Sequence, residues 1–386
     1  MRRILLLALL VLACRREKAP APGAGAATRV DVVEQESLTD IVRGATIVSR
    51  TGEALFEASA AEVIDGDPGT YWLNPPGDFP QSMAIAFPAR ARLDRVGLRG
   101  TANRVQFESS ADGAAWQALT TVTAKDTTGA QWFDVAPMEA AFLRVTVTGP
   151  PPSQKDVRLQ SVLARGAELE PPRPGPIEGC WALNGRAARF AQRGAHVAGV
   201  LAIGNLPLYL DGGSDGRIVR LVWIRGNDYG LALASVSPDS KHLTALEWHE
   251  EAIPLFRAES WFGQPGACPA VSLRDDVAAA LLQRVGRYSA FGLRFRDDDT
   301  LDVDASRETL EILARQMKNA RIVVHEFREA TPQANKARAQ RILASVRAAL
   351  GSEGEFVAAG SDAPRQQPVT AAQRAMYSSV DLEIRR

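Results

Sequence analysis

The sequence predicts a multidomain protein in which an all-β domain and a small antiparallel β barrel or sandwich precede an α/β domain. Two clusters of chain breakers, rich in Pro and Gly, separate the domains at 168–176 and near 265–270. Strand-type alternation dominates before the second break, whereas strand and helix patterns alternate after it. We therefore place domains at 40–166, 177–270 and 274–386, with a linker at 167–176.

The first fourteen residues, MRRILLLALLVLAC, have the order of a secretory signal. Two arginines precede an apolar run that is too short to span a bilayer, which takes about 20 residues. The residues that lead into Cys14 resemble the lipobox of bacterial lipoproteins, in which this cysteine is acylated after cleavage. We expect a lipoprotein signal peptide over 1–13, a lipidated Cys14 and a flexible tether over 14–39. An ordinary signal peptide that contains a cysteine is the alternative.

Residue 15 bears on the destination of such a lipoprotein. It is Arg rather than Asp, which by resemblance to the sorting rule of Gram-negative lipoproteins implies the outer membrane. The side of that membrane, periplasmic or external, stays open. Linkers and tether would let three modules sit at different distances from the membrane.

Charge and cysteine content narrow the classes of partner. The 45 basic and 45 acidic side chains cancel, so no net field favours nucleic acid. Besides Cys14 there are two cysteines, Cys180 and Cys268, and an isolated pair in an oxidising compartment most simply forms a disulfide. Two free buried thiols are the alternative. A metal site is disfavoured, because no CxxC or paired histidines accompany the cysteines.

Apolar and polar residues alternate over 105–109 and 143–147 of the first domain, as in the strands of a β-sandwich. Three motifs resemble, in order, those of discoidin (coagulation-factor C-type) domains. They are VIDGDPGTYW at 63–72, VQFESSADG at 105–113 followed by Trp116, and FLRV at 142–145. The resemblance implies a jelly-roll that commonly binds glycans, lipids or proteins through variable loops at one end.

Bacterial sugar-binding members of that family often hold a structural calcium near the Asp-Gly loop. Asp65, Asp67 and Thr70 offer hard oxygen ligands there, so the resemblance implies a calcium site. This chain has Gln160 where the family usually adds a late acidic ligand. The alternative is a turn in which the two aspartates bond backbone amides.

Aromatic residues give little further sign of a sugar platform in this domain. Stacking on a sugar requires an exposed ring, and we expect Trp72 and Trp116 to lie in the core. Phe79 is the loop candidate for stacking, although a role as a loop anchor is favoured.

The middle domain is a series of apolar runs separated by glycines, which predicts strands. Residues 212–216 satisfy the GxSxG pattern, but 217–223 alternate like a strand, whereas a nucleophile elbow requires a helix there. We therefore predict a hairpin turn. His249 lies beside two glutamates without a second histidine at i+4, which predicts a strand end rather than a protease metal site. With four widely spaced histidines in the chain, we expect a protein that is not an enzyme.

The third domain is predicted to contain helices over 275–285, 307–319 and from Pro332 to Leu350, and strands over 291–295, 321–327 and 380–384. FRDDDTLDVDASRETLEILARQMKNARIVVHEF at 295–327, NKARAQRILASVRAAL at 335–350 and VDLEIR at 380–385 resemble the OmpA-like C-terminal domain. In that family an Asp after the second strand and an Arg of the long helix clamp the diaminopimelate of peptidoglycan, and Arg341 falls in the Arg position. The Asp is missing, so Glu326 or Glu329 would have to substitute.

The sequence thus predicts a non-catalytic lipoprotein of the cell envelope. The OmpA-like domain would bind peptidoglycan, and the discoidin-like domain a carbohydrate or another ligand. Membrane contact would come from the lipid anchor, and no cofactor is expected beyond the structural calcium. The alternative is an assembly or scaffold protein that binds only other proteins of the envelope, which the lost Asp favours.

Overall fold

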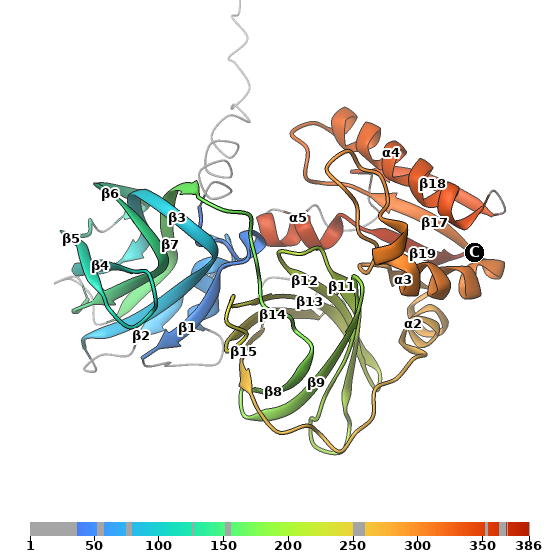
Figure 1. Ribbon diagram of the computed structural model, residues 1–386, viewed down its shortest axis with the longest axis horizontal. Helices are drawn as coiled ribbons and strands as arrows, with labels where there is room; N and C mark the ends of the chain where they lie inside the picture. Colours follow the sequence, from blue (N-terminus) through green and yellow to red (C-terminus); the bar gives the residue numbers. More distant parts are fainter. Residues whose placement is uncertain are drawn as a thin grey trace, which may run out of the picture.

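The computed structural model describes residues 37–51, 58–74, 79–125, 127–150, 156–249, 259–351, 354–362, 368 and 370–385. Cys14 and the tether up to residue 36 lie outside these residues. Three domains follow one another along the chain, coloured blue to green, green to yellow, and orange to red in Figure 1. In the part of the chain that is described, no helix is both long and apolar enough to cross a membrane.

The first domain is a jelly-roll built from a seven-stranded antiparallel sheet that curls around one core. The strand order is β2-β7-β3-β6-β4-β5, and β1 pairs with β3. Three bulges bend the long β3 strand, which allows it to pair with both β6 and β7 over the curved surface. The elements are η1 (Ile41–Arg43), β1 (Thr46–Arg50), η2 (Ala60–Ile64), β2 (Trp72–Asn74), β3 (Gln81–Thr101), β4 (Arg104–Ser110), β5 (Gln117–Thr123), β6 (Thr127–Val147) and β7 (Val157–Glu168).

The last residues of the predicted tether belong to this domain. Leu38 donates its backbone N–H to the carbonyl oxygen of Ala164 at 2.8 Å, and the Thr39 hydroxyl donates to that of Val162 at 2.5 Å. Both residues are buried. The predicted boundary at residue 39 was therefore wrong, because residues 37–39 already pack on β7.

The middle domain is a closed antiparallel barrel of eight strands, which confirms the barrel alternative. Its order is β10-β11-β12-β13-β14-β15-β8-β9, and β9 pairs with β10 to close it. Within β12, Val219, Leu221 and Trp223 point into the barrel core. The strands are β8 (Gly179–Leu183), β9 (Arg186–Arg193), β10 (His196–Leu201), β11 (Leu208–Ser214), β12 (Val219–Arg225), β13 (Asp228–Val236), β14 (Leu243–His249) and β15 (Glu259–Pro265).

The third domain is α/β, with a four-stranded mixed sheet in the order β16-β19-β17-β18. β17 and β18 are parallel, and the other two pairs are antiparallel. As predicted, Thr331 caps α4 by accepting a hydrogen bond from the Ala334 amide, and Gly351 ends it. The elements are α2 (Val277–Val285), β16 (Arg287–Ser289), α3 (Val303–Gln316), η3 (Met317–Asn319), β17 (Ala320–His325), α4 (Pro332–Leu350), β18 (Glu355–Gly360), α5 (Ala371–Tyr377) and β19 (Val380–Ile384).

One predicted strand of this domain is wrong. Residues 291 and 292 form a turn, in which the amide of Phe291 donates to the carbonyl oxygen of Ser289 and that of Leu293 to Ala290, and Phe295 makes an isolated bridge with Leu301. The run is apolar because Phe291 and Leu293 are buried, and not because it pairs in the sheet. The strand of this region is β16, four residues earlier.

The three domains pack against one another rather than standing apart on flexible linkers. Val222 and Ile224, on the outer face of β12, and Ile218 just before it belong to one apolar cluster with core residues of the jelly-roll and the third domain. The linker is hydrogen-bonded to both neighbouring domains. The Arg173 amide donates to the carbonyl oxygen of Pro88 in the jelly-roll, and the Gly175 amide donates to that of Ser237 in the barrel. Both faces of β12 are therefore buried, one in the barrel core and the other against the neighbouring domains.

Polar contacts fix the two interfaces. Thr244 of β14 accepts a hydrogen bond from the Ile47 amide of β1 at 2.9 Å. On the other side, the Tyr288 hydroxyl of β16 donates to the buried Asp211 carboxylate of β11 at 2.5 Å. Desolvation of the ring hydroxyl and the charge of Asp211 hold the pKa of Tyr288 well above its usual value, so Tyr288 keeps its proton and remains a donor.

Candidate functional site

The predicted calcium residues lie together in the loop between η2 and β2, at one end of the jelly-roll. Asp65 is buried and accepts hydrogen bonds from the Asp67 amide at 2.7 Å and from the Thr70 hydroxyl at 2.8 Å. Asp67 in turn accepts from the Gly69 amide at 2.7 Å. The loop is thus the Asx-type turn of the alternative interpretation, and it leaves part of each carboxylate available for a further ligand.

The chemistry of this loop fits a hard cation. Burial, followed by the negative charge of Asp67, raises the pKa of Asp65 well above its usual value, and no basic side chain counters this shift. The Gln160 amide donates to the carbonyl oxygen of Pro68 at 2.7 Å, while its own side-chain oxygen is buried without a hydrogen-bond partner. Asp65 and Asp67 therefore offer carboxylate oxygens of the kind that Ca²⁺ takes, and Gln160 bonds the same loop. Bound calcium would neutralise the paired carboxylates and hold the loop in place.

The aromatic side chains of the jelly-roll differ in how deeply they are buried. Trp72 is fully buried, as predicted, and Phe79 is half-buried against the core. Trp116 is only half-buried, because it stacks on the Arg144 guanidinium, 4.3 Å from the ring centre, instead of entering the core. The structure adds Tyr71, which follows the Asp65 loop and stacks with Arg158 at 5.3 Å.

The register of the strands places Trp116 and Tyr71 at opposite ends of the jelly-roll. Ser110 pairs with Phe142 at the end of the jelly-roll where the turn to Trp116 lies. Arg158 pairs with Thr101 at the opposite end, next to the loop that carries Tyr71 and the two aspartates. Glu168, the last residue of β7, bonds Arg217 of the barrel, so the Tyr71 end is the end remote from that contact.

In the third domain, the residues predicted to bind peptidoglycan are linked by two residues that sequence reasoning missed. Arg338 of α4 lies 3.0 Å from Asp299, 3.5 Å from Glu326 and 2.9 Å from Glu329. Arg341 lies 2.8 Å from the same Asp299 and keeps 56% of its side chain exposed. Arg338 is one turn before Arg341 on the helix, and Asp299 ends an acidic run of three residues, so both could have been candidates.

Glu326 is committed to partners within the protein. Its carboxylate accepts from Arg328 at 2.6 and 2.8 Å and from the Ser378 hydroxyl at 2.9 Å, and its side chain is 0% exposed. Burial opposes ionisation, but the hydrogen bonds and charge of Arg328, with the charge of Arg338, outweigh it and lower the pKa of Glu326 to about 2. Glu326 is therefore a fixed anion that holds Arg328, and Arg341, Arg328 and Glu329 are the partly exposed groups of this cluster.

A cavity of about 370 Å³ adjoins this cluster between the third domain and the barrel. Its lining includes Glu326, Arg328 and Arg338 from the third domain and Arg217 and Arg220 from the barrel. Arg220 of β12 donates to the carbonyl oxygen of Ser378 at 2.9 Å, and burial lowers the pKa of its guanidinium. The cavity is thus polar and shared by two domains, which no motif of either one indicated.

The remaining chemical predictions concern the barrel. Cys180 and Cys268 form a disulfide with a Cα–Cα distance of 4.9 Å, next to the seam where β15 pairs with β8. Ser214 and Val219 pair across the β11–β12 hairpin, so the GxSxG stretch is the predicted turn. His249 ends β14 and lies 3.9 Å from the single carboxylate of Glu247, while the two glutamates that follow it lie outside the described residues.

Comparison with protein-family models matches the first domain. Residues 46–158 match the F5/8 type C domain model, which is the discoidin-like resemblance expected from the motifs. No curated protein matches the chain.

Solved structures resemble about a third of the chain. The C-terminal domain of a chitobiase from Bacteroides fragilis is 20% identical over 33% of this chain and 96% of that one, with a TM-score of 0.30. CBM32-5 of CpGH89 from Clostridium perfringens, in complex with GalNAc-β-1,3-galactose, is 14% identical over 32% and 94%, with a TM-score of 0.28. CBM32-3 from a family 31 glycoside hydrolase of Clostridium perfringens is 16% identical over 37% and 99%, with a TM-score of 0.30. The segment at 46–158 of this chain is a discoidin-like domain of the F5/8 type C kind.

Proposed function

We propose that this protein is a non-catalytic lipoprotein of the bacterial outer membrane that binds glycan, with its discoidin-like domain as the principal binding module. The observation that carries the proposal is the F5/8 type C match over residues 46–158 together with the jelly-roll that these residues form. The family binds ligands through loops at one end of the jelly-roll. In this chain we assign this role to the end with Tyr71, because the Glu168 contact to Arg217 of the barrel lies at the other end of β7.

Two features of that end suit a sugar. The Tyr71 ring offers a surface for stacking, and Arg158 beside it offers donors to hydroxyl groups. The Asp65 loop precedes Tyr71 directly, and calcium bound there would fix the loop before a ligand arrives. The ligand class we propose is therefore a carbohydrate with an apolar ring face.

The third domain supplies the second contact of the proposal. Its motifs resemble those of OmpA-like domains, and Arg341 keeps an exposed guanidinium at the edge of the Arg338 cluster. We propose that Arg341, with Glu329, contacts peptidoglycan in place of the usual Asp and Arg pair. Two weak sites on one anchored chain would raise the effective affinity for a wall without new contacts.

The complete burial of Glu326 favours a second candidate function. A carboxylate that is held by Arg328 and Ser378 cannot turn outward without breaking several hydrogen bonds. If no exposed acid replaces it, the third domain would be a repurposed fold and the protein a scaffold for other envelope proteins. Binding to purified glycan separates the two functions.

The experiment is a binding assay of the full-length protein, purified in detergent, against a surface panel of oligosaccharides. Tyr71→Ala should weaken binding about tenfold, because stacking of a ring is worth about 1 to 2 kcal/mol. Trp116→Ala is the matched control, since it removes a half-buried, arginine-stacked ring from the opposite end of the same domain. No binding by the wild-type protein, or equal losses in both variants, would contradict the proposal.

A further inference from the structure

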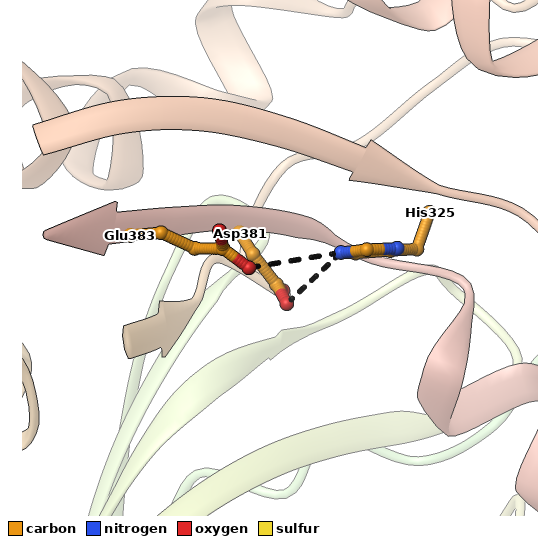
Figure 2. Close-up of side chains that lie close together, drawn as sticks. All are labelled: His325, Asp381 and Glu383. Atoms are coloured by element: carbon orange, nitrogen blue, oxygen red, sulfur yellow. Dashed lines mark ion pairs between the residues drawn. The ribbon is translucent and has the colours of Figure 1, made fainter. Parts of the chain in front are cut away.

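Three potential metal ligands converge at the end of β17 in the third domain. Asp381 and Glu383 are alternate residues of β19, so their side chains leave the same face of the sheet. They pair with Val323 and Arg321 of β17, which places His325, two residues further along, on that same face. Figure 2 shows the imidazole ring pointing at both carboxylates.

The separations within this trio are too long for hydrogen bonds. His325 Nε2 lies 3.8 Å from Asp381 Oδ2 and 3.9 Å from Glu383 Oε1. A hydrogen bond between such atoms spans about 2.7 to 3.2 Å, so neither contact is one. Two atoms that each bind one ion at about 2.1 Å, in contrast, can be separated by up to about 4.2 Å.

Burial makes this arrangement unusual for groups without a ligand. The side chains of His325 and Asp381 are 8% and 2% exposed, and that of Glu383 is 19% exposed. In the described part of the chain, His325 Nδ1 and Asp381 Oδ1 are buried and have no hydrogen-bond partner. Since buried polar groups are nearly always satisfied, the unpartnered Asp381 Oδ1 and an imidazole Nε2 that lies 3.8 Å from Asp381 Oδ2 point to a missing ligand.

Two arginines hold the carboxylates in position. Arg321 donates to Glu383 Oε2 at 3.0 Å, which leaves Oε1, the other oxygen, facing the histidine. Arg287 lies 3.6 Å from Asp381 Oδ2. In metal sites, partners of this kind orient the side chains that bind the ion. They also offset the two negative charges, so we expect micromolar rather than nanomolar affinity.

We propose that His325, Asp381 and Glu383 bind a divalent transition metal, with Zn²⁺ as the probe that best matches one imidazole and two carboxylates. Calcium and magnesium are disfavoured, because they take oxygen ligands and avoid imidazole nitrogen. All three ligand atoms lie within 4.8 Å of one another, so a slight closure of the Asp381–Glu383 pair completes the site.

Such a metal would fasten the end of β17 to β19. His325 directly precedes Glu326, and both residues line the cavity shared with the barrel. The ion would therefore fix the strand end from which Glu326 and Arg328 project. This role is independent of glycan binding by the discoidin-like domain.

The test is zinc binding by the full-length protein after treatment with EDTA and dialysis. We expect a competition titration against a chromophoric chelator to give one site that His325→Ala weakens about 100-fold or more, since loss of an outer partner alone costs about 10- to 100-fold. Glu383→Gln should weaken it as well, and this variant keeps the fold testable because its side chain is partly exposed. Thermal unfolding should shift upward with Zn²⁺ in the wild type only.

His249→Ala is the matched control. It removes another histidine that lies 3.9 Å from one carboxylate, but outside the trio, and should leave zinc affinity unchanged. Absence of stoichiometric zinc binding by the wild type would overturn the proposal. Zinc binding that survives both His325→Ala and Glu383→Gln would overturn it too, because the ion would then lie elsewhere.

Discussion

Replacing Glu326 with Gln isolates the charge of the most tightly held carboxylate in the third domain. The amide keeps an acceptor for the Phe327 amide and for Ser378, which bond Glu326 at 3.1 and 2.9 Å. It removes the negative charge that faces Arg328 at 2.6 Å and Arg338 at 3.5 Å. The variant therefore tests the charge rather than the packing.

The magnitude follows from the pKa of Glu326, which falls from 4.5 to about 2. A pKa that is lower in the folded state stabilises the protein above the unfolded value, and this stabilisation is lost as pH falls toward the folded value. A difference of this size corresponds to about 3 kcal/mol at neutral pH. We expect Glu326→Gln to lower the free energy of unfolding by that amount at about pH 7, and by less than half of it at about pH 3.

The assay is a urea titration of the full-length protein, followed by far-ultraviolet circular dichroism at both pH values. All α-helices in the described residues lie between Val277 and Tyr377, so the helical signal reports this domain. Glu329→Gln is the control, because Glu329 is half-exposed and holds a single ion pair, which is worth less than about 1 kcal/mol. A loss below about 1 kcal/mol for Glu326→Gln, or a loss that is the same at both pH values, would refute the reasoning.

Three further predictions concern the other domains. Calcium at 100 times its dissociation constant should stabilise the wild type by about 2.7 kcal/mol, measured by thermal unfolding. Asp65→Asn should abolish this gain in stability. A stabilisation by calcium that persists in the variant would exclude the loop as the calcium site. Cys268→Ala opens a disulfide that joins residues 88 apart and should cost about 4 to 5 kcal/mol in a urea titration, whereas a cost below about 1 kcal/mol would show that the barrel closes without it. Glu168→Gln weakens the 2.8 Å contact to Arg217 and should speed amide hydrogen exchange at Leu169 and Arg173, whose amides donate to Arg90 and Pro88; unchanged exchange would mean that the linker is held by its other contacts.

The sequence revealed much of the fold, because local patterns report local burial. The alternation at 105–109 is strand β4, whose Val105 and Phe107 are fully buried. The apolar run at 218–224, interrupted by Arg220 alone, could be identified as a strand, but the reason why both of its faces are apolar could not. Alternate residues there enter the barrel core, and the others are covered by neighbouring domains.

Contacts between distant segments explain what the sequence did not reveal. The apolar run at 291–295 suits a strand or a buried turn equally well, and only the packing of Phe291 and Leu293 decides for the turn. Trp116 was expected in the core because it is large and apolar, yet Arg144 from another strand supplies a stacking partner near the surface. The packing of the domains against one another could not be predicted either, because no local pattern shows which face of a strand another domain covers.

The candidate site was predicted in part. The Asp65 loop and the Cys180–Cys268 pair were found from residue type and spacing alone. Arg341 and Glu329 were found through the resemblance to OmpA-like domains, but Arg338 and Asp299, which connect them, come from two segments that only the fold brings together. The function of these residues remains the proposal made above.

The most direct test of a wall-binding protein is sedimentation of the full-length chain, in detergent, with purified peptidoglycan sacculi. We predict that the wild-type protein and Arg307→Ala pellet with the sacculi, whereas Arg341→Ala pellets much less. Arg307 is the matched control, because it is an exposed arginine of the same domain that pairs with Asp304 at 2.7 Å. A wild-type protein that stays in the supernatant would contradict glycan binding at the wall, and equal pelleting of Arg341→Ala would contradict the role of the third domain.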